Sequence, residues 1–370
     1  MINKIESNLK SVDHILHIAD VHLRNWKRHT EFKKVFDSLF EVADNLPPNS
    51  IITIGGDIVH AKTDMSPELI DMVSYLFNGL ADRHPTIVIT GNHDANLNNQ
   101  HRLDALTPIV NSNRHPNLFY LRNTDLYEIG DIAISVFSLL DSSEDYITYD
   151  KIDNPEKYKK LVALYHGTIS NSKVDSGLTL EHGLEWDKFA GFDVVPLGDI
   201  HKRQVLSKQN PAIFYPGSLV QQNFGEAYEG HGYALIDLTK KDRVDYSFTD
   251  IPNDYGYYTL DISNGVLPDN LPITAKTRLR VRTKNTDSAQ LKRLLATIRK
   301  DYKNKDAVII KLDKGNDNTF GDFDENTINQ GDIRNVQYQN QLLKEYLEDI
   351  GTDPLTVSKC VDINTKLNQE

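Results

Sequence analysis

Five short segments of the chain carry histidine, aspartate or asparagine directly after an apolar run. Side chains of these types bind divalent cations and move protons. Burying them together without a counterion is costly, because like charges cannot share a dry space unpaired. Two divalent cations bridged by a carboxylate would balance the charge, and their usual separation of about 3.5–4 Å suits in-line attack at phosphorus. The segments are Asp20-Val21-His22, Gly56-Asp57-Ile58-Val59-His60, Gly91-Asn92-His93-Asp94, His166-Gly167 and Gly198-Asp199-Ile200-His201.

Each segment alone has a plain structural explanation. An Asp-x-His pair is commonly a helix cap or a hydrogen-bonded histidine, and Gly-Asn-His-Asp fits a turn, because glycine and asparagine favour turn dihedrals. Caps and turns do not explain five such segments in order, each behind a predicted strand. We therefore expect their side chains to meet in one crevice, where the carboxyl ends of strands converge.

The elements that would position these segments alternate regularly. Apolar residues at helical spacing over Phe32–Phe40 predict a helix with Thr30 as its N-cap and Pro47-Pro48 beyond its end. Ser66-Pro67 predicts the start of a second helix. The alternation of strand and helix is typical of βαβ units and of a parallel sheet.

Strands dominate the chain from Asp131 onward, and the pattern then changes near Pro252 to a small strand–strand–helix–strand unit. The stretch that follows is rich in Asp, Asn and Gly, which is typical of a flexible linker, and Pro354 predicts the start of a short final helix. We therefore expect a main domain, a small α+β domain, a linker and a helical tail, with the boundaries 1–252, 253–313, 314–332 and 333–370.

Composition narrows the class of protein. The 370 residues include 41 Lys and Arg against 53 Asp and Glu, a net charge of −12, which argues against bulk electrostatic binding of nucleic acid. The single cysteine, Cys360, excludes a disulfide framework and a thiolate metal cluster. We find no apolar run of the roughly 18–20 residues that span a membrane and no signal peptide, so we expect a cytoplasmic protein.

Basic residues gather in two places despite the acidic total. Arg24, Lys27 and Arg28 follow the first segment, and Lys202 and Arg203 follow the last. In the small unit, alternate positions of one predicted strand would present one basic face, which could hold phosphates, or be a solvated or helix-packing face. No aromatic stacking platform is apparent, so we expect recognition of DNA ends and backbone. The alternating residues are Lys276, Arg278, Arg280, Arg282 and Lys284.

The ordered segments resemble those of the calcineurin-like metallophosphoesterase superfamily, over roughly residues 12–250. The match is closer to its SbcD-type branch of DNA double-strand-break repair nuclease subunits, including phage-type recombination endonuclease subunits. The closer match is carried by His60 after Asp57, by Leu197–Gln204, and by the tract from Tyr215-Pro-Gly-Ser-Leu219 through Phe224-Gly-Glu226 to Tyr233. The resemblance implies an α/β fold: a β-sandwich flanked by helices, a small α+β capping domain and C-terminal partner-binding helices.

The resemblance also implies a role for each residue that matches. The enzyme that it implies would bind two divalent cations, manganese or alternatively magnesium. The nucleophile would be a hydroxide activated by these cations. His93, oriented by Asp94, would protonate the leaving oxygen, and His60 would assist at the phosphate. The first cation would be held by Asp20, His22, Asp57 and His201, and the second by Asp57, Asn92, His166 and Asp199.

Position 199 departs from the family pattern, which has Gly-His-x-His where this chain has Gly198-Asp199-Ile200-His201. A carboxylate can replace the imidazole as a ligand and would favour harder ions such as manganese or magnesium. The alternative is that Asp199 is a turn residue and the second metal site is weak.

Three functions remain open at this level. The first, implied by the resemblance, is a DNA nuclease with 3′-to-5′ exonuclease and single-strand or hairpin endonuclease activity. It would act as a homodimer in a bacterial or phage-infected cytoplasm, directed by an SbcC-type coiled-coil ATPase that binds the tail. The second is a phosphatase or phosphodiesterase, which would not need the chain beyond about residue 250. The third is an inactive scaffold for the ATPase.

Overall fold

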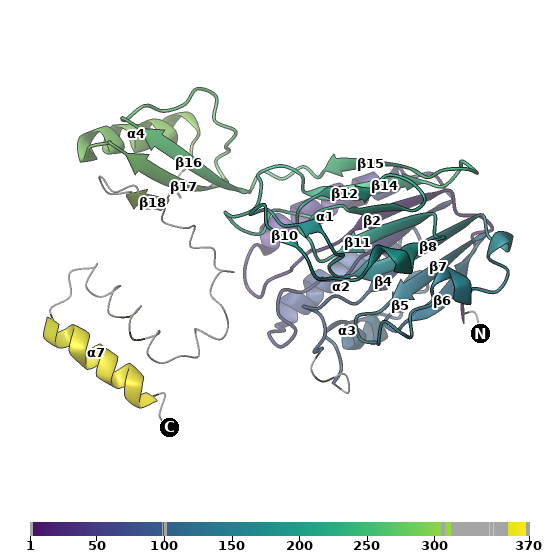
Figure 1. Cartoon of the computed structure of the whole chain (residues 1–370). Helices are drawn as coiled ribbons and strands as arrows, with labels where there is room; N and C mark the ends of the chain where they lie inside the picture. Colours follow the sequence, from purple (N-terminus) through teal and green to yellow (C-terminus); the bar gives the residue numbers. More distant parts are fainter. Residues whose placement is uncertain are drawn as a thin grey trace. The chain divides into compact units, whose positions relative to one another are not determined.

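The computed structural model describes residues 3–97, 99, 102–304, 308–311, 340, 343 and 354–367. The chain divides into two compact units, 1–314 and 315–370 (Figure 1). The predicted linker at 314–332 lies outside the described residues, as does most of the tail at 333–370. Within the second unit, helix α7 spans Pro354–Leu367 and starts at the predicted proline.

One half of the main domain is a six-stranded sheet with the strand order β15-β14-β2-β3-β4-β5. Strands β2 to β5 are parallel, and β14 and β15 are antiparallel additions beside β2. The runs are rich in Ile and Val, which suits strands buried on both faces. The strands are β2 (His14–Ile18), β3 (Ser50–Ile54), β4 (Thr86–Ile89), β5 (Leu118–Leu121), β14 (Gly232–Asp237) and β15 (Asp245–Asp250).

The other half is a seven-stranded sheet with the order β1-β6-β7-β8-β11-β13-β12. Its centre, from β7 through β8 and β11 to β13, is parallel. Ile15 and Ile51 of the first sheet share one buried apolar cluster with Ile134 and Val162 of this one, so the two sheets form a sandwich. The strands are β1 (Asn3–Lys4), β6 (Asp125–Ile129), β7 (Ile132–Phe137), β8 (Lys160–His166), β11 (Val194–Gly198), β12 (Gln204–Ser207) and β13 (Ala212–Tyr215).

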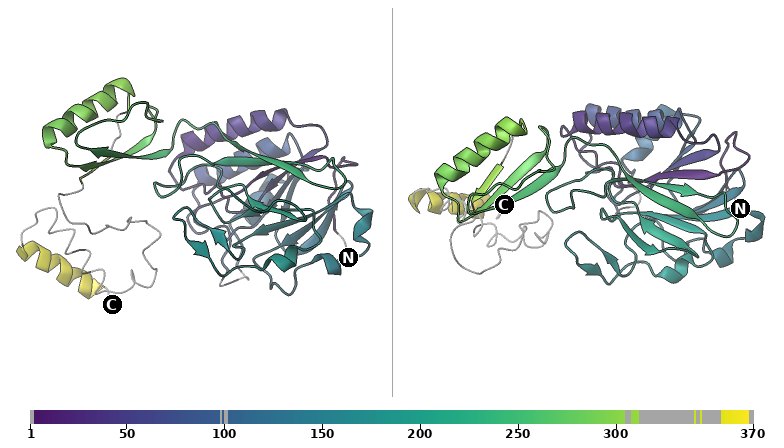
Figure 2. Two further views of the ribbon diagram at one scale, coloured as in Figure 1. Left: turned by 45° about the horizontal axis from the view of Figure 1, so that its top comes forward. Right: turned by 90° about the horizontal axis from the view of Figure 1, so that it is seen from above.

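Helices cover the six-stranded sheet on its outer face, as Figure 2 shows for the purple and blue helices. They are α1 (His29–Asp44), α2 (Pro67–Ala81) and α3 (Leu106–Asn113). The outer face of the seven-stranded sheet packs against Phe189 of the short 3-10 helix η3 (Trp186–Phe189) and against Tyr146 and Ile152, which flank the 3-10 helix η1 (Tyr149–Lys151). The predicted α/β sandwich flanked by helices is confirmed.

The predicted start of α2 is confirmed, and the predicted start of α1 is wrong. Ser66 caps α2, accepting a hydrogen bond from the Leu69 N–H, and Pro67 occupies its first turn, as predicted. The prediction of Thr30 as the cap of α1 is wrong. The N-cap is Arg28, two residues earlier, because its carbonyl accepts the first helical bond from the Phe32 N–H; the φ of Arg28 is 64°.

The small unit is a three-stranded parallel sheet of β16 (Tyr257–Ser263), β17 (Arg278–Lys284) and β18 (Val308–Lys311), packed against α4 (Ser288–Asp301). Asp287 and Gln290 form a capping box at the start of α4. The order matches the predicted strand–strand–helix–strand pattern; the domain boundary at 252/253 stays a prediction. Among the described residues, no helix combines the length and apolar composition needed to cross a membrane.

Candidate metal centre

All five segments come together at the carboxyl ends of parallel strands. Asp20 follows β2, Asp57 follows β3 and Asn92 follows β4 in one sheet. In the other sheet His166 ends β8 and Asp199 follows β11. Because the strands within each sheet are parallel and the sheets face each other, these ends meet in one place.

The side chains predicted to hold the first cation lie close together. The Nε2 atoms of His22 and His201 lie 2.9 Å apart, and Nε2 of His22 lies 3.4 Å from Oδ2 of Asp57. One potential ligand atom from each of Asp20, His22 and His201 falls within 4.8 Å of the others. The structure thus groups the four predicted side chains.

The second predicted cluster lies on the other side of Asp57. Its Oδ1 atom is 3.4 Å from Nε2 of His166. One atom of the Asn92 amide lies 3.1 Å from both Asp57 oxygens and 3.0 Å from Nε2 of His166. If this atom is the amide oxygen, it faces only hydrogen-bond acceptors, and a cation between them would satisfy all of these groups. If this atom is the amide nitrogen, Asn92 donates hydrogen bonds to the Asp57 carboxylate. Either way, Asp57 turns one oxygen to each cluster, as a bridging ligand does.

Asp199 is held beside this second cluster. Its N–H donates to Oδ1 of Asp20 at 3.0 Å, and its Oδ2 accepts from the Thr168 hydroxyl at 2.8 Å. The other oxygen, Oδ1, lies 4.0 Å from Nε2 of His166. The carboxylate therefore borders the second cluster, and ligation of a cation by Asp199 stays a prediction.

Strained backbone turns several of these side chains inward. Asp20, His22, Asp57 and Asp199 have φ values of 53°, 52°, 55° and 100°, in the left-handed region. Such conformations cost of order 1–3 kcal/mol for non-glycine residues and persist mostly at functional sites. Gly91 is needed here, because a Cβ at this position would lie 2.1 Å from Oδ1 of Asp57.

Burial makes the charges of this cluster interdependent. Burial, with the Asp57 carboxylate adding to it, raises the pKa of Asp20 to about 7. Burial opposes ionisation of Asp57 too, but His166 and His22 outweigh it and hold the pKa of Asp57 far below its usual range. Without cations the site must keep protons on some ligands. This donor set of carboxylates, imidazoles and an amide therefore fits two divalent cations.

His166 and His201 are each oriented by a hydrogen bond at the ring nitrogen Nδ1. Nδ1 of His166 bonds the Gly55 carbonyl at 2.6 Å, and Nδ1 of His201 bonds the Glu226 carboxylate at 2.8 Å. Each bond leaves Nε2 facing the cluster, as metal-binding histidines require. Glu226 had no role among the predictions from the sequence; its place in the Phe224-Gly-Glu226 tract was the available signal.

His93 and His60 lie next to the first cluster. The His93 ring centroid is 4.8 Å from that of His22, and its Nδ1 bonds the His60 carbonyl at 2.6 Å. Burial, with the charge of Arg24, lowers the pKa of His60 to about 4, so its ring is neutral at pH 7.

The prediction that Asp94 orients His93 is wrong. The Asp94 carboxylate is fully buried and accepts from three backbone N–H groups, those of Ile58, Val59 and Gly91, at 2.9–3.0 Å. It therefore fastens the loop after β3 to the loop after β4. The orienting group of His93 is the His60 carbonyl.

The predicted DNA-contacting arginines bond mainly within the protein. Buried Glu31 accepts from Arg28 at 2.7 Å and from Arg278 at 2.8 Å. The alternation along β17 is confirmed, since its basic side chains share the more exposed face. The other partners are Asp250 for Arg203, Asp261 for Arg282 and the Phe224 ring, at 4.1 Å, for Arg280.

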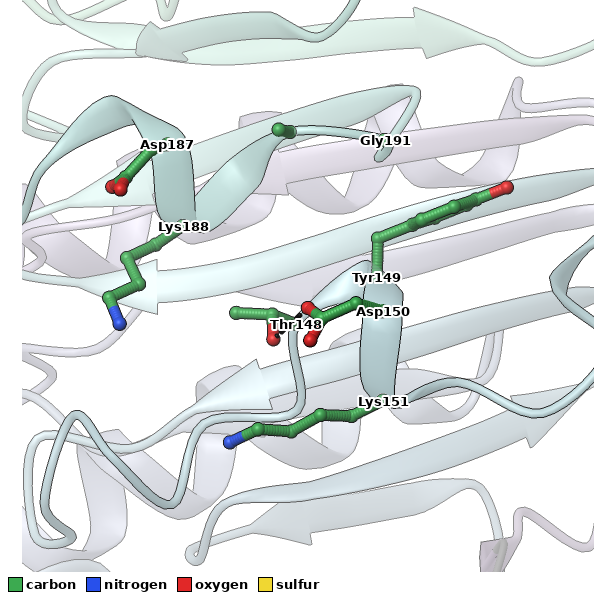
Figure 3. Close-up of a pocket in the computed structure, with 8 residues that line it drawn as sticks. Thr148, Tyr149, Asp150, Lys151, Asp187, Lys188 and Gly191 are labelled. Carbon is green, nitrogen blue, oxygen red and sulfur yellow. Dashed lines mark hydrogen bonds between the residues drawn. The ribbon is translucent and has the colours of Figure 1, made fainter.

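Lys27 is exposed, whereas Arg24 and Lys202 are partly buried. DNA contact by any of these basic residues stays a prediction. Figure 3 shows a separate surface pocket, whose lining comes from η1 and from the η3 region rather than from the strand ends. Its labelled residues are Thr148, Tyr149, Asp150, Lys151, Asp187, Lys188 and Gly191.

Comparison with known proteins agrees with a site that binds divalent cations and acts on phosphate esters. The family model for calcineurin-like phosphoesterases matches residues 14–203. Over 97% of its length the chain is 35% identical to uncharacterized protein R555 of Acanthamoeba polyphaga mimivirus, but it spans only 26% of that protein.

Two further relatives are named as nuclease or repair proteins. One of them, a subunit of the nuclease SbcCD from Staphylococcus epidermidis, is 25% identical over 63% of this chain and 68% of its own. The DNA double-strand break repair protein Mre11 of Archaeoglobus fulgidus is 24% identical over 64% of this chain and 56% of its own. The family match covers half of the chain and includes every strand-end segment; the chain belongs to the calcineurin-like phosphoesterase family.

Proposed function

We propose that this phosphoesterase is a di-metal DNA nuclease that processes DNA ends, with 3′-to-5′ exonuclease and single-strand or hairpin endonuclease activity. The observation that carries the proposal is the Asp57 carboxylate, whose two oxygens each lie 3.4 Å from a histidine of a different cluster. A carboxylate in this position suits a pair of cations that act on one phosphodiester.

The ligand assignment is Asp20, His22, Asp57 and His201 for one cation and Asp57, Asn92, His166 and Asp199 for the other. Bound divalent cations, manganese or magnesium, would supply a hydroxide nucleophile at neutral pH and polarise the phosphoryl group. His93 gives a proton to the leaving oxygen. Since its Nδ1 is held by the His60 carbonyl, Nε2 is the atom that gives the proton.

Two observations favour DNA over a small ester as substrate. Relatives with nuclease and DNA-repair names match 63% and 64% of the chain, which is more than the family model matches at residues 14–203. The chain also continues into the small domain, which a small-ester hydrolase would not need. We further propose an SbcC-type ATPase as the partner of residues 333–370 and a homodimer as the working form.

A phosphatase or phosphodiesterase is the second candidate, because the metal centre alone suits either. A relative from Invertebrate iridescent virus 6, named putative phosphoesterase 244L, is 28% identical over half of this chain. An inactive scaffold is disfavoured, because the metal ligands and His93 are all present and grouped.

The test is cleavage of linear duplex and hairpin DNA in manganese by the unmodified chain and by His93→Ala. General acid catalysis contributes about 10²–10⁴-fold, and we expect the variant to lose that much. Equal cleavage by both proteins would remove the assigned role of His93. Turnover of small phosphate esters with no cleavage of DNA would favour the second candidate.

A further inference from the structure

Trp26 is the feature of the chain that the metal centre leaves unexplained. The residue is 68% exposed, although tryptophan is normally well buried. It lies in a tight turn closed by an antiparallel bridge between Arg24 and Lys27, and its φ of 58° is in the left-handed region. A bulky residue held in that conformation and facing solvent points to a functional constraint.

The turn is fastened on both sides, so the exposure does not come from a loose loop. Before it, Leu23 pairs with Val59 in the loop that carries Asp57 and His60. Within it, the Asn25 amide donates to Asp64 at 2.6 Å. After it, Arg28 is tied to Glu31 and to the Gln221 carbonyl at 2.7–2.9 Å.

The turn lies beside the metal centre. Trp26 follows the candidate ligand His22 by four residues, a length of chain that reaches at most about 14 Å. The His60 N–H donates to the carbonyl of Leu23 at 2.9 Å, which fastens the start of the turn, directly before Arg24, to the loop that carries His60. The neighbours of Trp26 in the turn are the amide of Asn25 and the exposed ammonium of Lys27.

We propose that Trp26 stacks on a nucleobase of a single-stranded substrate, while Arg24 and Lys27 lie against the flanking phosphates. The proposal rests on the proposed nuclease function and adds base stacking, which no pattern in the sequence indicated, to the recognition of the backbone. An aromatic ring between cations is the arrangement that binds single strands without reading their sequence. A protein-docking surface would instead surround the ring with further apolar side chains.

The two tryptophans of the chain allow a direct optical test. Trp186→Phe leaves Trp26 as the only indole, and the matched Trp26→Phe leaves Trp186, whose Nε1 donates to the Ser170 carbonyl. Each full-length variant is titrated in magnesium with cleavage-resistant phosphorothioate oligothymidylate, with oligouridylate, and with an abasic oligomer of the same length. We expect both base-bearing oligomers to quench Trp26 emission, the abasic one to leave it unchanged, and Trp186 to respond to none.

Affinity gives an independent readout. Stacking is worth about 1–3 kcal/mol per base, so Trp26→Ala should weaken oligothymidylate binding by about 5–150-fold. Trp26→Phe should recover most of the loss, and Val266→Ala, which shortens another exposed apolar side chain, should have no effect. Unquenched Trp26 emission, or an unchanged affinity of Trp26→Ala, would overturn the proposal.

Failure of this proposal can be told apart from failure of the proposed function. Hydrolysis of bis(4-nitrophenyl) phosphate by the unmodified chain in manganese reports the metal chemistry without a nucleobase. Hydrolysis without any quenching would reject stacking by Trp26 and leave the phosphodiesterase chemistry standing. Quenching by the oligomers would support the stacking contact whether or not that ester is hydrolysed.

Discussion

The metal centre and the basic face of β17 are both dense clusters of charge, and they are organised in opposite ways. In the metal centre, carboxylates and imidazoles from five strand ends face one another across distances that suit shared cations. On β17 the arginines face groups of the protein itself: Glu31 for Arg278 and Asp261 for Arg282. The metal centre is arranged to take counterions from solution, whereas the arginines of β17 are largely neutralised by carboxylates of the protein itself.

The contrast shows what residue spacing can predict. Residues placed after parallel strands are brought together by topology, so their type and position indicate a site. Alternation along one strand fixes only a shared face, because the partners come from elsewhere in the chain. Substitutions in the two clusters, and the pH dependence of metal binding, can test this contrast.

Apart from Asp57, the position where a substitution should have the largest effect is Asp199. We expect Asp199→Ala to lose one metal ion per chain and at least about 100-fold in activity, because the second cation would lose a charged ligand. Asp199→His, which restores the usual family residue, should keep both ions. Metal analysis after dialysis checks this, and an unchanged ion content in Asp199→Ala would assign the residue to the turn.

Glu226 should have a smaller effect at the same centre. It bonds Nδ1 of His201 at 2.8 Å and is itself 6% exposed. Loss of such an orienting carboxylate typically weakens metal affinity by about 10–100-fold. We expect Glu226→Gln to fall in this range by calorimetry with manganese. Wild-type affinity in that variant would show that Glu226 has only a structural role.

Metal affinity should depend on pH in a defined direction. Burial and Asp57 raise the pKa of Asp20 to about 7. Burial opposes the charged form of His201, but Glu226 outweighs it and raises the pKa of His201 to about 9. A cation must displace these protons, so affinity should fall as pH drops below about 9 and more steeply below about 7, by about tenfold per pH unit for each proton displaced. A flat profile measured by titration would contradict these ligand assignments.

The β17 arginines should act on stability and differ from each other. Arg278→Ala removes one of the donors to buried Glu31, which keeps Arg28 and Asn253, so we expect a loss of about 1–2 kcal/mol in unfolding free energy. Arg282 pairs with a 61% exposed carboxylate, and Arg282→Ala should cost about 0–1 kcal/mol. Equal effects in urea unfolding, with a large loss of DNA binding, would restore β17 as a DNA-contacting face.

The fold and the membership of the metal centre could be predicted because both follow from local signals. Ser66-Pro67 started α2 as predicted, and the strands led to their metal-type residues. The roles of Asp94 and Glu226 could not be predicted, since they depend on contacts between separate loops. The exposure of Trp26 depends on a left-handed turn that no spacing rule indicates.

The most direct test of the proposed di-metal centre is the manganese content of the purified chain compared with that of Asp57→Asn. Both proteins are dialysed against manganese and then analysed by mass spectrometry of the metal. We predict two ions per chain in the unmodified protein and a loss of both in the variant, because Asp57 faces both clusters. An unmodified chain without manganese, or a variant that retains both ions, would contradict the assignment of Asp57 as the bridging ligand.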